Sequence, residues 1–357
     1  MKKPGISANR FAMPRRDVLF GAAAALLLAS RRAAAQSSAL PSLPASAMPH
    51  NAPAQLVLPG GATKPIPADP SLGKGKDRAL VLGGGGEYFI AWLVGFAHGL
   101  NTAGVPYELA DMIVGTSAGA VTGCALAANH TGLLQDDIEF FGEFPHILSA
   151  LVPTGSANPS QIRAREVAKA TRDGSPAAIQ AIGRAAMAAR NPSVIDLQLM
   201  IDVLALDQNW PSAKLYVTAT DCYSGERLVV AQTSGIPISH AVCASVSLPG
   251  VFGPTWIGDR FCMDGGMNAT GTHVDLVAGA KRALVVALTD PQQRFSHIPQ
   301  DVGQELKTLE AAGTKTLLVE ADPGKVHLLS PAEIEPALRA GHERALREAE
   351  RIKAFWA

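Results

Sequence analysis

The sequence predicts an α/β fold in which a largely parallel sheet is covered by helices on both faces. Short apolar runs typical of buried parallel strands, beginning with 78–82, alternate with stretches of helical character. Such alternation is the pattern of α/β domains. Glycine and alanine are abundant, which suits close packing of helices on a sheet. At 357 residues the chain is long enough for one large domain or two small ones.

The expected elements follow one another along the chain without an internal repeat. Strands are expected at 78–82, 112–114, 215–219, 227–231, 260–263, 283–288 and 316–319. Helices are expected at 90–102, 120–128, 238–245 and 331–355, the last with Glu/Arg pairs on a solvated face. Residues 140–212 are mostly helical in pattern, and their apolar runs make them a candidate acyl pocket or lid, with ordinary packing as the alternative.

Residues 1–35 have the pattern of a removable export signal. Arg15 and Arg16 precede an apolar run at 18–30, and the alanines at 33–35 offer a cleavage site. This run is shorter than the roughly 20 residues that a membrane-spanning helix needs. Paired arginines ahead of a weakly apolar run resemble a bacterial twin-arginine signal, which predicts export to the periplasm. The alternative is an uncleaved signal that anchors the protein in the membrane.

Composition also indicates where the folded domain begins and which kinds of binding partner the charge of the protein argues against. Residues 36–76 are rich in Pro, Ala and Ser and predict a linker, so the folded domain is expected over 77–357. Residues 1–35 carry seven basic side chains and one acidic one, so removing them changes the net charge from 0 to −6. A mildly acidic body without a basic stripe argues against nucleic acid and against electrostatic docking on anionic lipid.

The cysteines give no sign of a metal site or a redox pair. Cys124, Cys222, Cys243 and Cys262 show neither a CxxC pair nor the spacing of metal ligands. Each lies in an apolar or strand-like context, so we expect buried free thiols and no bound metal.

A candidate nucleophile stands in the segment 115–119, Gly-Thr-Ser-Ala-Gly. Ser117 follows an expected strand and precedes an expected helix, as a nucleophile elbow requires. A sharp turn there exposes the serine oxygen, and Gly115 and Gly119 make room where side chains would clash. The start of the helix adds backbone N–H groups and a positive dipole end. The sequence therefore predicts a reactive serine at position 117.

The glycine run 83–86 has three interpretations. Bare N–H groups after a strand can bind phosphate, can form an oxyanion hole, or can belong to a plain tight turn. The G-x-G-x-x-G spacing fails because Tyr88 and Phe89 occupy the positions where the third glycine would stand. No Lys-Ser or Lys-Thr follows, so a P-loop fails as well. A nucleotide-binding α/β protein is nevertheless a rival interpretation of this loop.

The base that would activate Ser117 is less clearly marked. Asp264 follows a short strand and precedes Gly265 and Gly266, which allow a close backbone approach. An ionised aspartate accepts a proton directly when it lies nearby, but Asp-Gly also commonly forms a plain turn. A Ser-His-Asp triad would use His273, His327 or His342 with Asp221 or Asp264. No local signal marks any of these histidines.

Five ordered blocks resemble the patatin-like phospholipase family. They are the glycine run, the Ser117 elbow, the Asp264-Gly-Gly segment, the strand and turn 218–226, and the A-S-x-x-x-P-x-x-F block at 244–252. The resemblance covers roughly residues 77–290. It implies a three-layer α/β/α fold and a lipid acyl hydrolase without metal or organic cofactor. Its substrates would be lipid or other esters, reached by transient contact with a membrane surface.

The same resemblance assigns the site residues. It implies Ser117 as nucleophile, Asp264 as base, and Gly84, Gly85 and Gly86 around the oxyanion hole. The family usually has a basic residue and then glycine shortly after the glycine run, whereas this chain has Glu87-Tyr-Phe-Ile. That departure motivates a rival hypothesis, a lipid-binding protein of the same fold with weak or absent catalysis.

Overall fold

The computed structural model describes the domain and leaves the N-terminal segments aside. The described residues are 69, 72–147, 157–192, 194–205, 209–268, 271–289, 294, 298 and 301–357. The expected export signal and most of the expected linker lie outside them and stay predictions. Residues 72–76, at the end of that linker, form a turn that packs on 277–281, where the Lys281 N–H donates to the Lys76 carbonyl. Within the described ranges no helix is both long and apolar enough to cross a bilayer.

An eight-stranded sheet forms the centre of the domain, and its order is β5-β6-β3-β2-β1-β7-β8 with β4 paired to β3. The pairings β3-β2-β1-β7-β8 are parallel, whereas β4 and β6 each run antiparallel to β3 and β5 runs antiparallel to β6. The strands are β1 (Arg78–Leu82), β2 (Met112–Gly115), β3 (Leu215–Asp221), β4 (Arg227–Ala231), β5 (Thr255–Ile257), β6 (Arg260–Asp264), β7 (Arg282–Leu288) and β8 (Lys315–Ala321).

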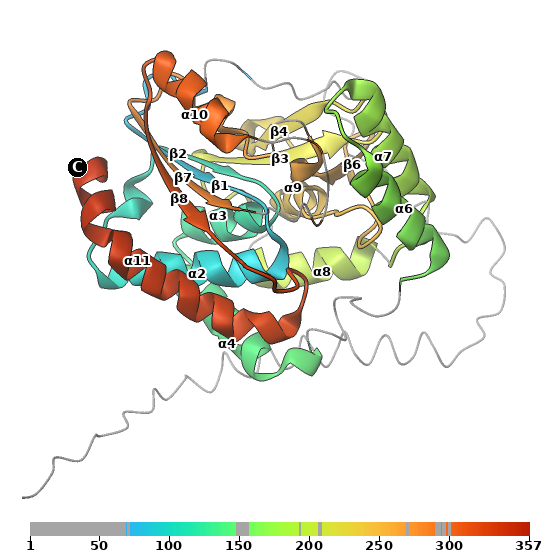
Figure 1. Ribbon diagram of the computed structural model, residues 1–357, viewed down its shortest axis with the longest axis horizontal. Helices are drawn as coiled ribbons and strands as arrows, with labels where there is room; N and C mark the ends of the chain where they lie inside the picture. Colours follow the sequence, from blue (N-terminus) through green and yellow to red (C-terminus); the bar gives the residue numbers. More distant parts are fainter. Residues whose placement is uncertain are drawn as a thin grey trace, which may run out of the picture.

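Helices cover both faces of this sheet, which gives the three-layer α/β/α arrangement (Figure 1). The described helices are α2 (Gly86–Thr102), α3 (Ala118–Ala128), α4 (Thr131–Glu143), α6 (Pro159–Ala170), α7 (Pro176–Ala188), α8 (Val194–Ala205), α9 (Ile238–Ser245), α10 (Val302–Ala311) and α11 (Ile334–Trp356). Short 3-10 turns are η2 (Tyr107–Leu109), η3 (Gln232–Ser234), η4 (Gly265–Met267), η5 (Val274–Val277) and η6 (Pro331–Glu333).

The alternation of side chains along β1 shows how one apolar run serves two cores. Leu80 and Leu82 enter the larger core, beneath α2, α3 and α9. Ala79 and Val81 point to the opposite face and pack with residues of η5 and α10. Because both faces are buried, the strand has to be apolar throughout, as the sequence predicts.

Two helices far apart in sequence cross at glycine contacts. A Cβ added to Gly95 of α2 would lie 1.9 Å from the Leu338 carbonyl oxygen, and one added to Gly341 of α11 would lie 1.9 Å from that of Trp92. The two backbones therefore approach closely, which holds α11 against the layer that carries the glycine run. Ala345 and Ile352 of α11 are fully buried in the same core.

The expected fold class is confirmed, and so are the seven expected strands, with small shifts at their ends. The elements that were not anticipated include β5, which has only three residues, most of α4, and α10, whose Asp301 side chain caps the helix by accepting from the Gln304 N–H. The first helix was expected to begin at 90 but begins at Gly86. It has no side-chain cap, because the preceding residues are glycines, and so its start carries none of the usual signals.

Gly341→Ala should lower the free energy of unfolding by at least about 2 kcal/mol, because the added methyl group meets backbone that cannot move aside. Gly132→Ala is the matched control, since nothing lies within 4 Å of the position of its added Cβ in α4. The control should be neutral or slightly stabilising. Urea denaturation of both variants measures the difference, and equal stabilities would contradict the close crossing of α2 and α11.

Candidate active site

Strand register brings three separate segments to one edge of the sheet. In the parallel part, Leu82 pairs with Gly115 and Gly115 with Val217, so the turns after β1 and β2 emerge side by side. Asp264 ends β6 opposite Ala219, two residues beyond Val217. It therefore lies level with Ser117, which is two residues beyond Gly115. Ligand sites of open α/β sheets form at this carboxyl edge.

Ser117 adopts the backbone conformation of a nucleophile elbow. Its φ is 52°, a value that non-glycine residues rarely adopt, and it stands directly before α3. Such strain persists only where the surroundings enforce it. Here the Ser117 N–H donates to Oγ of Ser245 at 2.8 Å, a buried partner contributed by α9. Ser245 lies in the 244–252 block, but nothing in the sequence indicates this contact.

The two glycines of the elbow are required by close backbone packing. A Cβ on Gly119 would lie 2.1 Å from the Leu82 carbonyl oxygen, and one on Gly115 would lie 2.5 Å from the Gly119 carbonyl oxygen. Neither position can hold a larger residue without displacing backbone. The Gly119 N–H also donates to the Gly83 carbonyl at 3.0 Å, which ties the elbow to the glycine run.

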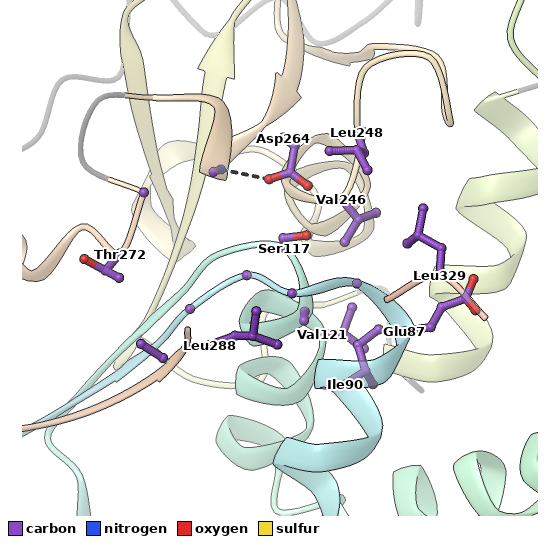
Figure 2. Close-up of a pocket in the computed structure, with 18 of the residues that line it drawn as sticks. Glu87, Ile90, Ser117, Val121, Val246, Leu248, Asp264, Thr272, Leu288 and Leu329 are labelled. Atoms are coloured by element: carbon purple, nitrogen blue, oxygen red, sulfur yellow. Dashed lines mark hydrogen bonds between the residues drawn. The ribbon is translucent and has the colours of Figure 1, made fainter. Parts of the chain in front are cut away.

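Asp264 is a buried carboxylate whose side chain faces that of Ser117 across the site (Figure 2). Its Oδ1 accepts from the Gly266 N–H at 2.8 Å, the dashed contact in Figure 2. Burial raises the pKa of Asp264 to about 7, and the Gly266 N–H and the Ser117 side chain, which favour the ionised form, offset only part of that effect. A carboxyl with such a pKa titrates near neutrality, as a general base should.

The backbone after Asp264 is held from two sides. A Cβ on Gly265 would lie 2.5 Å from Oγ1 of Thr218, so the expected close approach of this segment is present. On the other side, Nε2 of His273 donates to the Gly265 carbonyl at 2.9 Å. Burial lowers the pKa of His273 to about 4, with a smaller contribution from Arg227, so the ring is neutral at pH 7. His273 thus holds the backbone directly after Asp264 in place through this hydrogen bond, a role that the sequence does not indicate.

The glycine run lies directly against the serine. A Cβ added to Gly84 would lie 3.2 Å from the Ser117 Cβ. In the described chain, no backbone carbonyl accepts from the N–H groups of Gly84 or Gly85. The Ala118 N–H, at the first position of α3, is likewise without an intrahelical partner. Among the described residues, unpaired N–H groups thus lie in the glycine run that packs against Ser117 and in Ala118, the residue that follows the serine.

A pocket of about 540 Å³ opens over these groups, with Ser117 and Asp264 in its lining. This size suits a small-molecule or acyl ligand. Most of the wall is apolar, and its side chains come from α2, α3, α4, α8, the start of α11 and the loops after β8 and α9. They include Ile90, Val121, Ile138, Phe141, Met200, Ile201, Leu204, Val246, Leu248, Phe252, Leu329 and Ile334. Helix α8 and the last residues of α4 belong to the region 140–212, which was expected to shape a pocket, whereas most of the apolar run at 147–152 lies outside the described residues.

The alternative triad does not assemble around Ser117. None of the described histidines lines the pocket. His342 packs against His98 at a ring distance of 5.1 Å, and Nδ1 of His327 accepts from the Leu329 N–H. Asp221 forms an ion pair with Arg260 and accepts from the Tyr223 N–H at 2.8 Å, so it stabilises the turn after β3.

Two further expectations concern metals and thiols. The residues described include no group of three or more His, Cys, Asp or Glu side chains arranged to hold a metal ion. The four cysteines are buried and free, and burial raises the pKa of Cys222, Cys243 and Cys262 well above that of an exposed thiol. Such thiols are inert packing groups.

Fold and pocket together define an α/β protein whose ligand site lies at the carboxyl edge of parallel strands. The sequence matches the family described as patatin-like phospholipase over residues 80–274, more than half of the chain. The chain belongs to this family, a class of hydrolases that act on lipid esters. The match contains Ser117 and Asp264 together with the glycine run.

Solved structures that align with this chain are larger than it and distant in sequence. VipD from Legionella pneumophila aligns with a TM-score of 0.38 and 16% identity over 77% of this chain and 67% of VipD. The type III effector ExoU aligns with a TM-score of 0.34 and 18% identity over 82% of this chain and 54% of that chain. ExoU in its heterodimeric complex with SpcU, from Pseudomonas aeruginosa, aligns with a TM-score of 0.33 and 19% identity over 80% of this chain and 53% of that chain. The chain thus spans about half the length of both ExoU chains. No curated protein matches the sequence.

Asp264→Asn should change how stability depends on pH. As the pH rises from about 4 to about 7, Asp264 ionises in the unfolded chain but not in the folded one, because burial raises its folded-state pKa to about 7. Its contribution to stability therefore falls over that window, by on the order of 4 kcal/mol. Relative to wild type, Asp264→Asn should gain about that much between pH 4 and pH 8 in urea denaturation. Ser117→Ala keeps the aspartate and should not show this gain; a pH-independent difference for Asp264→Asn would contradict the raised pKa.

Proposed function

We propose that this protein is a serine lipid acyl hydrolase that cleaves carboxylic esters through a Ser117–Asp264 dyad and an acyl-enzyme intermediate. The observation that carries the proposal is that the Ser117 and Asp264 side chains face each other on the wall of an apolar pocket, where the serine side chain favours the ionised form of the buried carboxyl. Family membership supplies the lipid ester as the class of substrate.

In the first step, Ser117 Oγ attacks the ester carbonyl while ionised Asp264 takes the hydroxyl proton. The carbonyl oxygen becomes an oxyanion, which the N–H groups of Gly84, Gly85 and Ala118 stabilise by hydrogen bonds. Removing one such donor costs about 10²–10³ in rate in other hydrolases. The alcohol leaves with the proton that Asp264 had accepted, and the acyl group stays on the serine.

In the second step, water attacks the acyl-enzyme. Asp264 again accepts a proton, now from water, and the same N–H groups hold the second oxyanion. Collapse releases the carboxylic acid and returns the proton to Ser117. A dyad suffices for both steps because a single carboxyl with a pKa near 7 can accept and return one proton each time.

The shape of the pocket supports an acyl substrate. Apolar side chains of α4 and α8 line the wall beyond Ser117, and no organic cofactor is needed for the chemistry. For a lipid substrate, the pocket would be reached by transient contact with a membrane or a lipid aggregate.

Ser117→Ala should lower kcat/KM for p-nitrophenyl esters by at least about 10³, because the nucleophile is lost while the binding surface remains. A fluorophosphonate probe should label wild-type protein at Ser117 and leave the variant unlabelled, as mass spectrometry of the labelled peptide will show. Equal hydrolysis by both proteins would refute the proposal.

kcat/KM should rise with pH and level off above about pH 7, because only the ionised form of Asp264 can accept the serine proton. A pH–rate profile from 5.5 to 9 measures this rise. The Glu87 carboxyl also titrates near neutrality, since burial raises its pKa to about 7. Glu87→Gln should therefore keep the same inflection, and its disappearance in that variant would contradict the assignment of the base.

The rival function is a lipid-binding protein with weak catalysis, and it rests on Glu87 beside the glycine run. The two functions differ in one measurable respect. A binding protein would take up fatty acyl ligands without turnover and without labelling of Ser117, whereas the hydrolase gives both.

A further inference from the structure

Glu87 is a second carboxylate in the pocket, and the dyad does not use it. It stands in the first turn of α2, directly after the glycine run, and its side chain is part of the pocket lining. In Figure 2 it lies on the same side of Ser117 as Ile90, Val246 and Leu329, all apolar, whereas Thr272 lies on the other side. Glu87 is therefore a polar group set in the apolar part of the pocket.

No contact within the described structure accounts for this carboxyl. Its Oε2 is shielded from solvent and has no hydrogen-bond partner there. None of the ion pairs among the described residues involves Glu87. Burying a carboxyl without a partner destabilises the fold, and a leucine would fill an apolar wall without that cost. A ligand that completes its hydrogen bonds gives the residue a function.

The charges around the pocket have a single sign. The charged residues in its described lining are all carboxylates, namely Glu87, Asp264, Asp301 and Glu320. The internal segments outside the described ranges contain neither lysine nor arginine. A phosphate or carboxylate near the scissile ester would meet no counter-charge in the described lining, and like charges would repel it.

We infer that the pocket selects uncharged esters whose acyl group carries a hydroxyl, which donates a hydrogen bond to the Glu87 carboxyl. This inference rests on the proposed hydrolase function and assigns its substrate class. The acyl group, rather than the alcohol, is the part that reaches Glu87, because the surrounding wall is apolar. Asp301 and Glu320 differ from Glu87 in already having partners, the Gln304 N–H and the Thr289 hydroxyl.

A hydroxyl fits this site better than an ammonium group. Burial raises the pKa of Glu87 to about 7, so a large part of the carboxyl is neutral near pH 7. A neutral carboxyl can accept from a hydroxyl and also donate to it, whereas it offers no charge to a cation. The apolar side chains around it would also make burial of an ammonium group costly.

The test uses p-nitrophenyl esters that share an eight-carbon acyl chain: octanoate, 3-hydroxyoctanoate, 8-hydroxyoctanoate, 8-aminooctanoate and the suberate half-ester. Wild type should cleave one of the hydroxy esters about tenfold better than octanoate in kcat/KM, the value of one good hydrogen bond. It should cleave the anionic suberate ester at least about tenfold more slowly than octanoate. The two hydroxy positions probe near and far placement along the acyl chain.

Variants of Glu87 test whether the preference for the hydroxy ester depends on the Glu87 carboxyl. Glu87→Leu should bring the ratio of hydroxy ester to octanoate close to one. Glu87→Gln keeps a hydrogen-bond acceptor and should retain most of the ratio, which guards against loss of folding in the leucine variant. Glu335→Leu is the matched control, a solvent-exposed glutamate in the first turn of α11, and it should behave as wild type.

Each contrary result points to a different error. A wild-type ratio near one, or a ratio unchanged in Glu87→Leu, overturns the inference while leaving Ser117-dependent hydrolysis intact. A preference for 8-aminooctanoate that Glu87→Gln abolishes replaces the hydroxyl by a cation and also overturns it. Hydrolysis of all five esters that survives Ser117→Ala refutes the proposed function itself.

Discussion

The placement of Ser117 is the constraint on which the rest of the site depends. A serine at φ 52° between a strand and a helix is held there by Gly115 and Gly119, which let backbone meet backbone, and by the Ser245 hydroxyl, which accepts its N–H. The same close packing brings the glycine run to within van der Waals contact of the serine. Pocket, elbow and N–H groups are thus consequences of one backbone geometry at the edge of the sheet.

Two carboxyls that are shielded from water lower the stability of the fold at this site. Asp264 and Glu87 both have pKa values raised to about 7 by burial, so each lowers the stability of the fold as the pH rises toward neutrality. Asp264 is partly compensated by Gly266 and Ser117, whereas Glu87 has no compensating contact among the described residues. Such uncompensated groups are typical of functional positions, where stability is given up for chemistry or recognition.

Local signals predicted some parts of the fold and site well and others poorly. The apolar run 78–82 and the strand-elbow-helix pattern around Ser117 could be read directly, because the constraints that shape them lie within a few residues. The start of α2 was misplaced because glycines cap it, and β5 was missed because three residues carry no periodicity. Ser245 and His273 could not be found, since their contacts join segments that are distant in the chain.

Three features can be recognised from the sequence alone: the α/β class, the reactive geometry expected at Ser117 and the unusual glutamate after the glycine run. That Asp264 lies level with Ser117 follows from the folded structure, because strand register across β2, β3 and β6 sets that position and no local pattern encodes it. The folded structure also shows that Glu87 lines the pocket and that its Oε2 has no partner among the described residues. The local backbone conformation depends on neighbouring residues, whereas the burial of a side chain and its hydrogen-bond partners depend on every element that packs around the site.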